Sequence, residues 1–137
     1  MSEVTAAERR SRLKNSENIF INCSNHPSAA WGDEQRRKAE VYGKIMDLPF
    51  PEVDPAWTAG RVREEAERVY REIVSLHPVA VMCQGEFTFT YALVSRLKEK
   101  GFTVLAACSR RRVEEISDET GSTQKKVIFT FEGFREY

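Results

Sequence analysis

Three short polar segments carry the residue types best suited to chemistry in this sequence. Each follows a run of apolar residues that has the character of a buried strand. The segments are Ser24-Asn25-His26, Gln84-Gly85-Glu86-Phe87-Thr88 and Ser109-Arg110-Arg111. Histidine suits general acid–base catalysis because its unperturbed pKa is about 6.5, and arginine suits the recognition of phosphate groups. Together the segments are typical of a site for a small anionic ligand.

Most of these residues also have a purely structural interpretation, which the sequence leaves open. Turn closure would account for Ser24 and Asn25, and simple exposure in a loop for His26. Helix capping and the helix dipole would account for Glu86, and packing or capping for Thr88. The glycine between the third expected strand and the helix that follows it would then serve only the tight turn. The run of arginines can equally be a solvated strand edge.

The second segment leads directly into a helix N-terminus, where backbone N–H groups bind anions readily. Together with Arg110 and Arg111, this favours a phosphodiester ligand whose base or ribose could be read by Asn25, Gln84 and Thr88. Neither G-x-G-x-x-G nor G-x-x-x-x-G-K-[ST] occurs, so ordinary dinucleotide and P-loop nucleotide binding are not supported. No His, Asp or Glu cluster has metal-ligand spacing. We therefore expect no metal and no cofactor, and any phosphodiester cleavage would be metal-independent.

The composition excludes several classes of partner. Lys plus Arg and Asp plus Glu each number 21, so the formal net charge is zero, which argues against a protein that coats duplex nucleic acid. No apolar run reaches the roughly 18 residues that a membrane span requires, and the N-terminus lacks the apolar core of a secretory signal. We expect a cytoplasmic protein without a membrane partner. Cys23, Cys83 and Cys108 are expected to be buried free thiols on strands.

Strands and helices alternate along the chain in the order that would position the three polar segments. Residues 1–17 are polar and are expected to form a flexible leader, and residues 18–137 a single domain of ordinary size. Asp33 and Thr58 are the expected helix N-caps. The expected elements are strand 19–23, helix 33–42, strand 44–48, helix 58–77, strand 79–83, helix 87–100 and strand 102–108.

Apolar strands that alternate with amphipathic helices predict a mainly parallel sheet with helices on both faces. The expected fold class is α/β, Rossmann-like and doubly wound, with the first and third strands side by side at the centre. A C-terminal antiparallel hairpin of residues 112–116 and 126–131, with Gly121 in its turn, would lie at one edge. Ligands bind such sheets beyond the carboxyl ends of the strands. The three polar segments are therefore expected to meet at one rim.

Four motifs stand out in combination, and they span residues 18–137. They are Asn18-Ile-Phe-Ile-Asn-Cys-Ser-Asn-His-Pro-Ser, Asp47-Leu-Pro-Phe-Pro, Gln84-Gly-Glu-Phe-Thr-Phe-Thr and Gly133-Phe-Arg-Glu-Tyr137. This combination resembles small stand-alone CRISPR-associated proteins near the CARF domains (CRISPR-associated Rossmann folds) and the ring nucleases. The resemblance implies a homodimer that binds cyclic oligoadenylate, with cyclic tetra-adenylate as the expected ring. The loops it assigns to the ligand correspond here to residues 24–26 and 109–111.

The resemblance also implies a reaction, the metal-independent opening of the cyclic messenger, which switches off an antiviral response. A ribose 2′-OH attacks the adjacent phosphate and leaves a 2′,3′-cyclic phosphate. His26 would take or give a proton, Glu86 is the alternative base, and Arg110 or Arg111 would stabilise developing charge. Two alternatives stay open. One is a sensor or sponge that binds the messenger without cutting it, and the other is a Rossmann-like domain that serves protein interaction.

Overall fold

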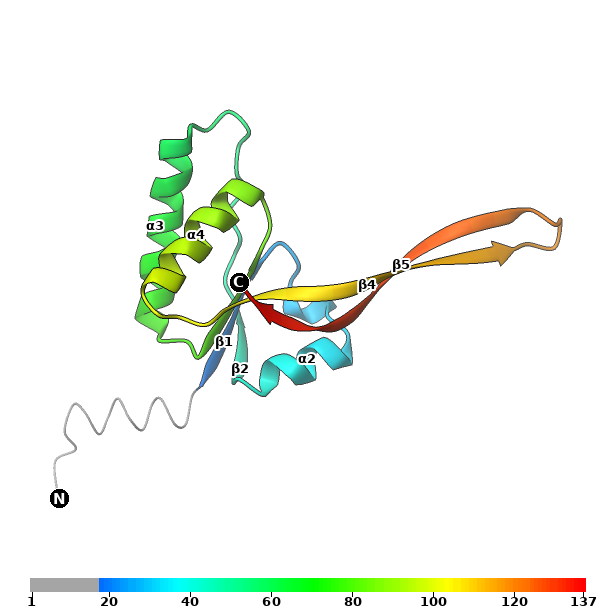
Figure 1. Ribbon diagram of the computed structural model, residues 1–137, viewed down its shortest axis with the longest axis horizontal. Helices are drawn as coiled ribbons and strands as arrows, with labels where there is room; N and C mark the ends of the chain where they lie inside the picture. The colour runs from blue at the N-terminus through cyan, green and yellow to red at the C-terminus, as the bar shows by residue number, and fades with distance from the viewer. Residues whose placement is uncertain (1–17) are drawn as a thin grey trace, which may run out of the picture.

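The computed structural model describes residues 18–137, so the leader expected over residues 1–17 lies outside the described residues. The described chain is an α/β structure built on one five-stranded mixed sheet (Figure 1). The strands are β1 (Ile19–Ser24), β2 (Lys44–Asp47), β3 (Ala80–Gln84), β4 (Val104–Ser117) and β5 (Thr123–Glu136). The helical elements are the 3₁₀ turn η1 (Ser28–Ala30) and the helices α2 (Asp33–Glu40), α3 (Ala59–Leu76) and α4 (Phe87–Glu99).

The sheet has the order β2-β1-β3-β4-β5, in which the first four strands run parallel and β5 runs antiparallel to β4. The prediction that the first and third strands are neighbours is confirmed, because β1 pairs with β3 from Phe20–Ala80 to Ser24–Gln84. The chain after β1 runs first to β2 on one side and then crosses to β3 on the other. The strand order therefore reverses between β1 and β3, where the carboxyl-end loops diverge.

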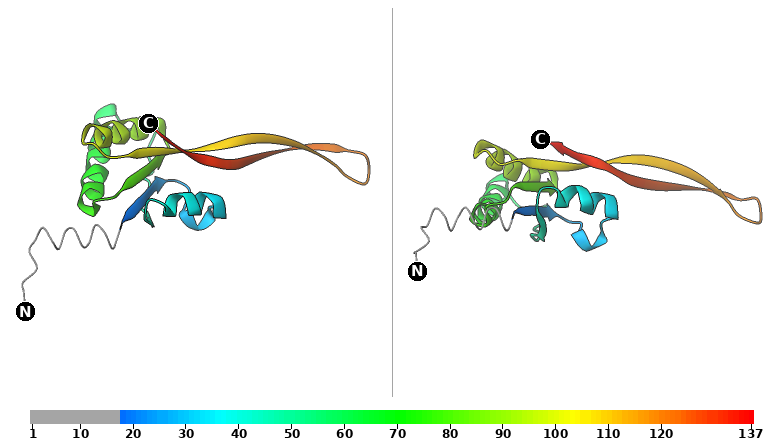
Figure 2. Two further views of the ribbon diagram at one scale, coloured as in Figure 1. Left: turned by 60° about the horizontal axis from the view of Figure 1, so that its bottom comes forward. Right: turned by 90° about the horizontal axis from the view of Figure 1, so that it is seen from below.

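Helices cover both faces of the sheet, as the apolar runs predict (Figure 2). Successive strand residues point to opposite faces, so Ile21 and Val81 pack into the core beneath α3 and α4. Their neighbours Phe20 and Ala80 pack on the other side, against Ala39 of α2. A strand buried on both faces needs apolar residues at consecutive positions, which explains the absence of alternation in β1 and β3.

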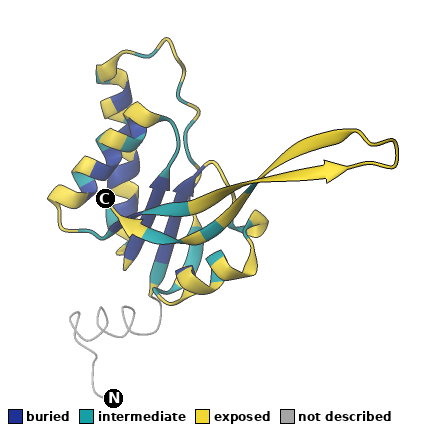
Figure 3. Cartoon of the chain, turned by 45° about the vertical axis from the view of Figure 1, so that its right-hand side comes forward, coloured by how far each residue is buried: buried dark blue, intermediate teal, exposed yellow. Residues whose placement is uncertain are grey.

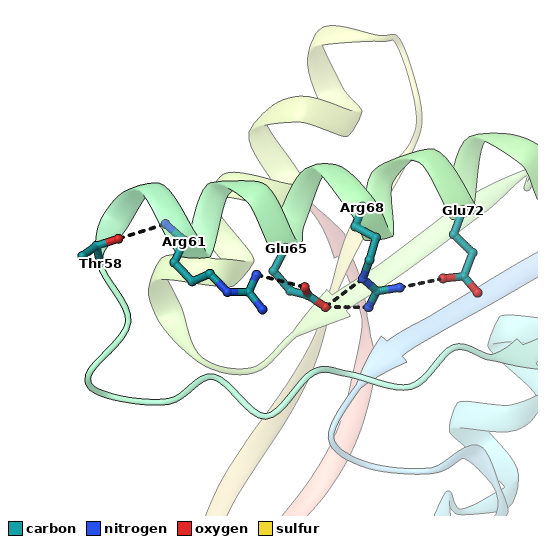
Figure 4. Close-up of polar contacts among 5 residues, drawn as sticks. All are labelled: Thr58, Arg61, Glu65, Arg68 and Glu72. Carbon is teal, nitrogen blue, oxygen red and sulfur yellow. Dashed lines mark hydrogen bonds and ion pairs between the residues drawn. The ribbon is translucent and has the colours of Figure 1, made fainter.

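Helix α3 begins where the sequence predicts. The Thr58 hydroxyl caps it by accepting a hydrogen bond from the Arg61 backbone N–H at 3.1 Å. One face carries a row of ion pairs, in which Glu65 contacts Arg61 at 3.3 Å and Arg68 at 2.5 Å, and Arg68 contacts Glu72 at 3.6 Å (Figure 4). The hydrogen bond from Arg68 holds the pKa of Glu65 below its ordinary value. The adjacent face buries the predicted apolar stripe of Val62, Ala66, Val69 and Ile73.

The start of α2 differs from the prediction by one residue. Gly32 is the N-cap, and Asp33 lies in the first turn, where its carboxylate gains from the helix dipole instead of capping. The helix ends at Glu40, and a turn through Gly43 leads into β2. A Cβ at Gly43 would lie 2.3 Å from the backbone carbonyl oxygen of Asn18, so only glycine fits this approach of two backbones.

The largest departure from the sequence prediction concerns the end of the chain. The fourth strand does not stop at Cys108 but continues to Ser117, and β5 pairs with it from Leu105 onward. Only Val104 and Leu105 of β4 pair with β3, so the rest of the strand has β5 as its one neighbour in the sheet of the described residues. We call residues 109–131 the arm, a two-stranded ribbon that projects from the body (Figures 1 and 2) and is largely exposed (Figure 3).

Two local features shape the arm. The pairing passes from Cys108–Gly133 to Ser109–Phe131 and skips Glu132, which forms a bulge at its base. At its tip the Asp118 carboxylate accepts hydrogen bonds from the backbone N–H groups of Thr120 and Ser122, at 2.9 Å each. The turn residue Gly121 has a φ of +82°, which agrees with the predicted role of glycine in this turn.

The cysteines follow the sequence prediction in part. Cys23 and Cys83 are buried and lie opposite each other in the β1–β3 ladder, whereas Cys108 is half-buried. A hydrogen bond to Cys23, together with burial, raises the pKa of the Cys83 thiol far above its ordinary value, so Cys83 is not an activated nucleophile. Among residues 18–137, no helix combines the length and apolar character that crossing a bilayer requires.

Candidate functional site

An open groove of about 710 Å³ lies at the carboxyl ends of the central strands. We call it the carboxyl-end groove. One wall comes from the base of the arm and the other from η1 and the start of α2, while β1 and β3 contribute the residues between them. Four of the polar residues singled out in the sequence line it, namely Ser24, His26, Gln84 and Ser109. Three chain segments are thus brought together at this rim, as expected for this kind of sheet.

A buried polar network holds the loop after β1. Asn22 is 1% exposed, and its side-chain amide donates to the His26 carbonyl and to the Asp47 carboxylate, each at 2.9 Å. The Ser24 hydroxyl donates to the Asn22 side-chain oxygen at 2.7 Å and accepts from the His26 backbone N–H at 3.2 Å. Asp47 also accepts the Ser28 backbone N–H at 3.2 Å. The backbone of His26 is therefore fixed from both sides, and this exposed residue belongs to the groove lining.

Asn22 and Asp47 position the loop after β1, and the sequence analysis did not single them out as site residues. An asparagine within the apolar run 19–23 is the signal that could have identified the first, because a buried amide requires partners. Asp47 ends the edge strand β2, beside that asparagine in the ladder. Neither residue lines the groove, and both act by holding the loop that does.

Gln84 connects two strands at the floor of the groove. The β3–β4 ladder ends at Met82–Leu105, and beyond it the Gln84 side-chain oxygen accepts a hydrogen bond from the Ala107 backbone N–H. The side chain thus replaces the missing backbone partner of Ala107, and no other residue from 18 to 137 bonds to its amide NH₂ group. This glutamine has a structural role and a site role at once.

The other residues of the second polar segment turn away from the groove. Glu86 is the N-cap of α4, and its carboxylate accepts the backbone N–H groups of Thr88 and Phe89 at 2.9 Å each. These hydrogen bonds lower the pKa of Glu86, and the one from the Phe89 N–H has the largest effect. The Thr88 hydroxyl also donates to this carboxylate, at 2.7 Å. Gly85 faces the ring of Phe50 in the core beneath α3 and α4. Gly85, Glu86 and Thr88 therefore do not belong to the lining of this groove.

The third polar segment is not a loop, because Ser109, Arg110 and Arg111 lie within β4. Arg110 is paired with Glu132 at 2.8 Å, and this pair lowers the pKa of Glu132. Arg111 is exposed and lies opposite Phe129, a residue of the groove wall. Asn25 is exposed and does not belong to the groove lining. Of these candidates, Ser109 lines the groove, and Arg110 and Arg111 lie opposite its lining residues Thr130 and Phe129.

Aromatic rings form the part of the groove that the sequence analysis missed. Trp31 stands on one wall, and Phe129 and Phe131 stand on the other. Phe131 packs edge-to-face with Phe134 at a ring-centroid distance of 5.1 Å, which fixes its position. Flat aromatic surfaces next to amides and hydroxyls suit nucleobases, because bases stack on rings while their edges form hydrogen bonds.

The charge of the groove is acidic at one end. Asp33 and Glu34 line it from the first turn of α2, and no Lys or Arg belongs to the lining drawn from residues 18–137. Two cations lie beside its aromatic wall: Arg111 is opposite Phe129 in the ladder, and the Lys38 ammonium lies 5.8 Å from the centroid of the Phe131 ring. Within the same described range, no three His, Cys, Asp or Glu side chains are grouped so as to hold a metal ion.

A second hollow, of about 680 Å³, lies between α3 and α4 on the opposite side of the sheet. Thr88 lines it, together with the exposed rings of Phe87 and Tyr91 and the partly buried Trp57. It contains none of the other polar residues singled out in the sequence. The carboxyl-end groove is therefore the better candidate for the functional site.

The fold and the groove together define an α/β protein with an open, aromatic-lined ligand groove at the carboxyl ends of a mostly parallel sheet. The chain belongs to the uncharacterized protein MJ1673 family, whose family model matches residues 18–135. No curated protein and no solved structure matches the chain. The matched region covers the elements from β1 to β5, apart from the last residue of β5, and includes every residue that lines the groove.

Proposed function

We propose that the protein is a CARF-like, Rossmann-like component of type III CRISPR antiviral defence that binds cyclic oligoadenylate in the carboxyl-end groove. The observation that carries this proposal is the convergence of Ser24, His26, Gln84 and Ser109 beside the three aromatic rings, at the point where the strand order reverses. The same proposal places the protein in the cytoplasm, with cyclic tetra-adenylate as the ring to test first.

The groove offers different chemistry to each part of such a ligand. Adenine rings would stack on Trp31, Phe129 and Phe131, and Gln84 would bind a base edge or a ribose hydroxyl. Arg111 is the one candidate cation beside the groove that the structure leaves without an ion pair within the described residues, and it would contact phosphate. The acidic first turn of α2 would repel phosphate, so the phosphates are expected on the side of the arm.

His26 is the proposed catalytic residue for opening the ring. A ribose 2′-oxygen attacks the adjacent phosphorus, the bond from phosphorus to the 5′-oxygen breaks, and a 2′,3′-cyclic phosphate remains. The 2′-hydroxyl loses a proton and the leaving 5′-oxygen gains one, so His26 could serve as the base for the first transfer or as the acid for the second. The network around Asn22 would hold the imidazole ready for either role.

Binding without cleavage is the second candidate function, and a specific observation favours it. Two of the four proposed catalytic groups are already engaged, since the Glu86 carboxylate caps α4 and Arg110 pairs with Glu132. His26 and Arg111 would then have to perform the reaction alone. A sensor or sponge needs only the stacking and hydrogen-bonding surface of the groove.

The deciding experiment incubates the purified protein with cyclic tri-, tetra- and hexa-adenylate in EDTA and analyses the products by mass spectrometry. Linear products ending in cyclic phosphate support the ring nuclease, with a loss of at least tenfold expected for His26→Ala. The matched control is His77→Asn, which replaces the other histidine at the end of α3, where φ is +49° and asparagine is tolerated. Intact ligand that co-elutes with the protein supports the sponge. If the protein neither binds nor cleaves any of the three rings, both functions are refuted.

A further inference from the structure

The side chain of Gln84 is held in a single orientation by the backbone beside it. Its amide oxygen accepts the backbone N–H of Ala107, a donor that lies beyond the last pair of the β3–β4 ladder, Met82–Leu105. The reverse orientation would place the amide NH₂ group against this N–H, with two donors facing each other. The chemistry of the Ala107 amide therefore decides which way the Gln84 amide points.

The fixed amide presents hydrogen-bond donors to the groove. Gln84 is half-buried in the groove lining, and its oxygen is engaged by Ala107. The NH₂ group carries two N–H donors, to which no other residue of the range 18–137 bonds. A ligand atom that contacts this group must therefore be an acceptor. The exocyclic amino group of adenine does not meet this condition, whereas a ribose oxygen does.

The position of Gln84 between the two walls favours the sugar over the base. Gln84 is paired with Ser24 in the β1–β3 ladder, and the Ser24 hydroxyl accepts the backbone N–H of His26 at 3.2 Å. Gln84 thus lies beside the loop that carries His26. The aromatic rings stand on the walls of the groove, so bases that stack on them leave the sugar–phosphate backbone over the residues in between.

We propose that Gln84 is the ribose-selecting residue of the groove, and that its NH₂ group donates to a 2′-oxygen of the cyclic oligonucleotide. This inference rests on the function proposed above. The 2′-hydroxyl is the group by which a protein distinguishes RNA from DNA at a given site. The groove accordingly takes rings built from ribonucleotides and discriminates against rings that lack the 2′-oxygen.

The same contact orients the hydroxyl that would attack phosphorus. A 2′-oxygen that accepts a hydrogen bond from Gln84 keeps its own hydrogen, and Gln84 offers no competing acceptor for it. The hydrogen is then directed toward His26, in the role of general base. The selection of ribose does not require cleavage, so it holds equally for a protein that only binds the ring.

The first test compares cyclic tetra-adenylate with its 2′-fluoro analogue. Fluorine keeps the sugar pucker of ribose, but it is a poor acceptor and cannot attack phosphorus. Binding is measured by stopped-flow quenching of tryptophan fluorescence before turnover, with Trp31 in the groove wall as the reporter. We expect the unchanged chain to bind the ribose ring about fivefold more tightly, as one neutral hydrogen bond provides.

Two matched variants show whether this preference belongs to Gln84. Gln84→Met removes the donors and keeps the length of the side chain, so the preference should fall below about twofold. Gln35→Met changes the other glutamine of the groove lining, on the α2 wall, and should keep the preference. Equal binding of both rings by the unchanged chain, or a preference that survives Gln84→Met, would overturn the proposal and leave the proposed function intact. Binding of neither ring would refute the proposed function and the selection of ribose with it.

The second test needs no ligand and examines the contact that holds Gln84. Hydrogen exchange of the Ala107 amide, followed by NMR, should be at least about tenfold faster in Gln84→Met and unchanged in Gln35→Met. Gln84→Glu keeps an oxygen acceptor for Ala107 and should retain slow exchange. If Ala107 exchanges equally slowly in Gln84→Met, the orientation of the amide is not fixed as described, and the proposal is overturned whatever the rings do. If Gln84→Met does not fold, Gln84→Glu and the comparison of the two rings on the unchanged chain still decide.

Discussion

Replacement of Gly85 by alanine is the substitution whose cost can best be worked out from the structure. A Cβ at this position would lie 2.3 Å from Cζ of Phe50 and 2.6 and 2.7 Å from the two Cε atoms of the ring. Carbon atoms in contact are normally about 3.5–4.0 Å apart, so the ring must move by more than about 1 Å. Its neighbour is the fully buried Phe89, with ring centroids 5.0 Å apart. We expect Gly85→Ala to lower the free energy of unfolding by about 1–3 kcal/mol.

The same geometry predicts the outcome when Phe50 is removed. The backbone of Gly85 does not have the positive φ of Gly43, Gly101 and Gly121. An alanine at residue 85 is therefore strained by Phe50 and not by its own backbone. In a chain with Phe50→Ala, Gly85→Ala should cost nothing, or raise the free energy of unfolding by up to about 1 kcal/mol by restricting the unfolded chain.

Urea unfolding followed by far-ultraviolet circular dichroism gives the four free energies of this double-mutant cycle. Gly60→Ala in α3 is the matched control, since the nearest atom to a Cβ there is the Thr58 hydroxyl oxygen at an ordinary contact distance of 3.7 Å, and it should stabilise by about 0.5–1 kcal/mol. A cost of Gly85→Ala that is the same with and without the Phe50 ring, to within about 0.5 kcal/mol, would refute the reasoning.

Three further substitutions test the positioning network, a helix cap and the C-terminus. Asn22→Ala leaves Asp47 and the His26 carbonyl without their buried donor and should cost about 1–3 kcal/mol in urea unfolding, with faster amide exchange in residues 25–28. Glu86→Ala removes the cap of α4 and should cost about 1 kcal/mol. Because the folded-state pKa of Glu86 is lowered, its contribution is present above the unfolded-state pKa and is lost as pH falls through the folded one. Glu86→Gln should therefore flatten the acid side of a stability–pH profile, and an unchanged profile would contradict the cap. Tyr137→Phe deletes the hydrogen bond from the phenol to the Cys83 carbonyl, 2.6 Å long, and should cost about 1 kcal/mol by thermal unfolding, whereas no loss would show that water replaces it.

The body of the fold could be predicted from the sequence because its apolar runs are long and buried on both faces. Strand β1 and the helix that Thr58 begins lie where the pattern predicts them. The cap of α2 is misassigned, since an aspartate is a good first-turn residue as well as a good cap, and residue type does not separate the two. The end of β4 is also missed. A strand that leaves the body needs no apolar face, so the polar run of Ser109 to Arg112 has the composition of a loop.

The candidate site could be predicted in its location and only partly in its members. Ser24, His26 and Gln84 meet because the carboxyl ends of parallel strands share one edge, a rule that needs only the order of the elements. The residues after Gln84 lie outside the groove for a local reason, because the chain enters α4 at once and Glu86 caps that helix. The aromatic wall could not be foreseen, because Phe129 and Phe131 belong to a strand whose register with β4 depends on the Glu132 bulge.

The continuity of β4 has a consequence for local unfolding. Val104 and Leu105 are buried between β3 and β5, so their amides should exchange with solvent only when the whole structure opens. Farther along the same strand, the hydrogen bonds to β5 are exposed and can open separately. Within its 14 residues, β4 therefore contains amides that exchange only on global unfolding and amides that exchange through local opening. The amides near its far end would report any molecule that covers the arm, while those at its start would report unfolding of the domain in the same exchange experiment.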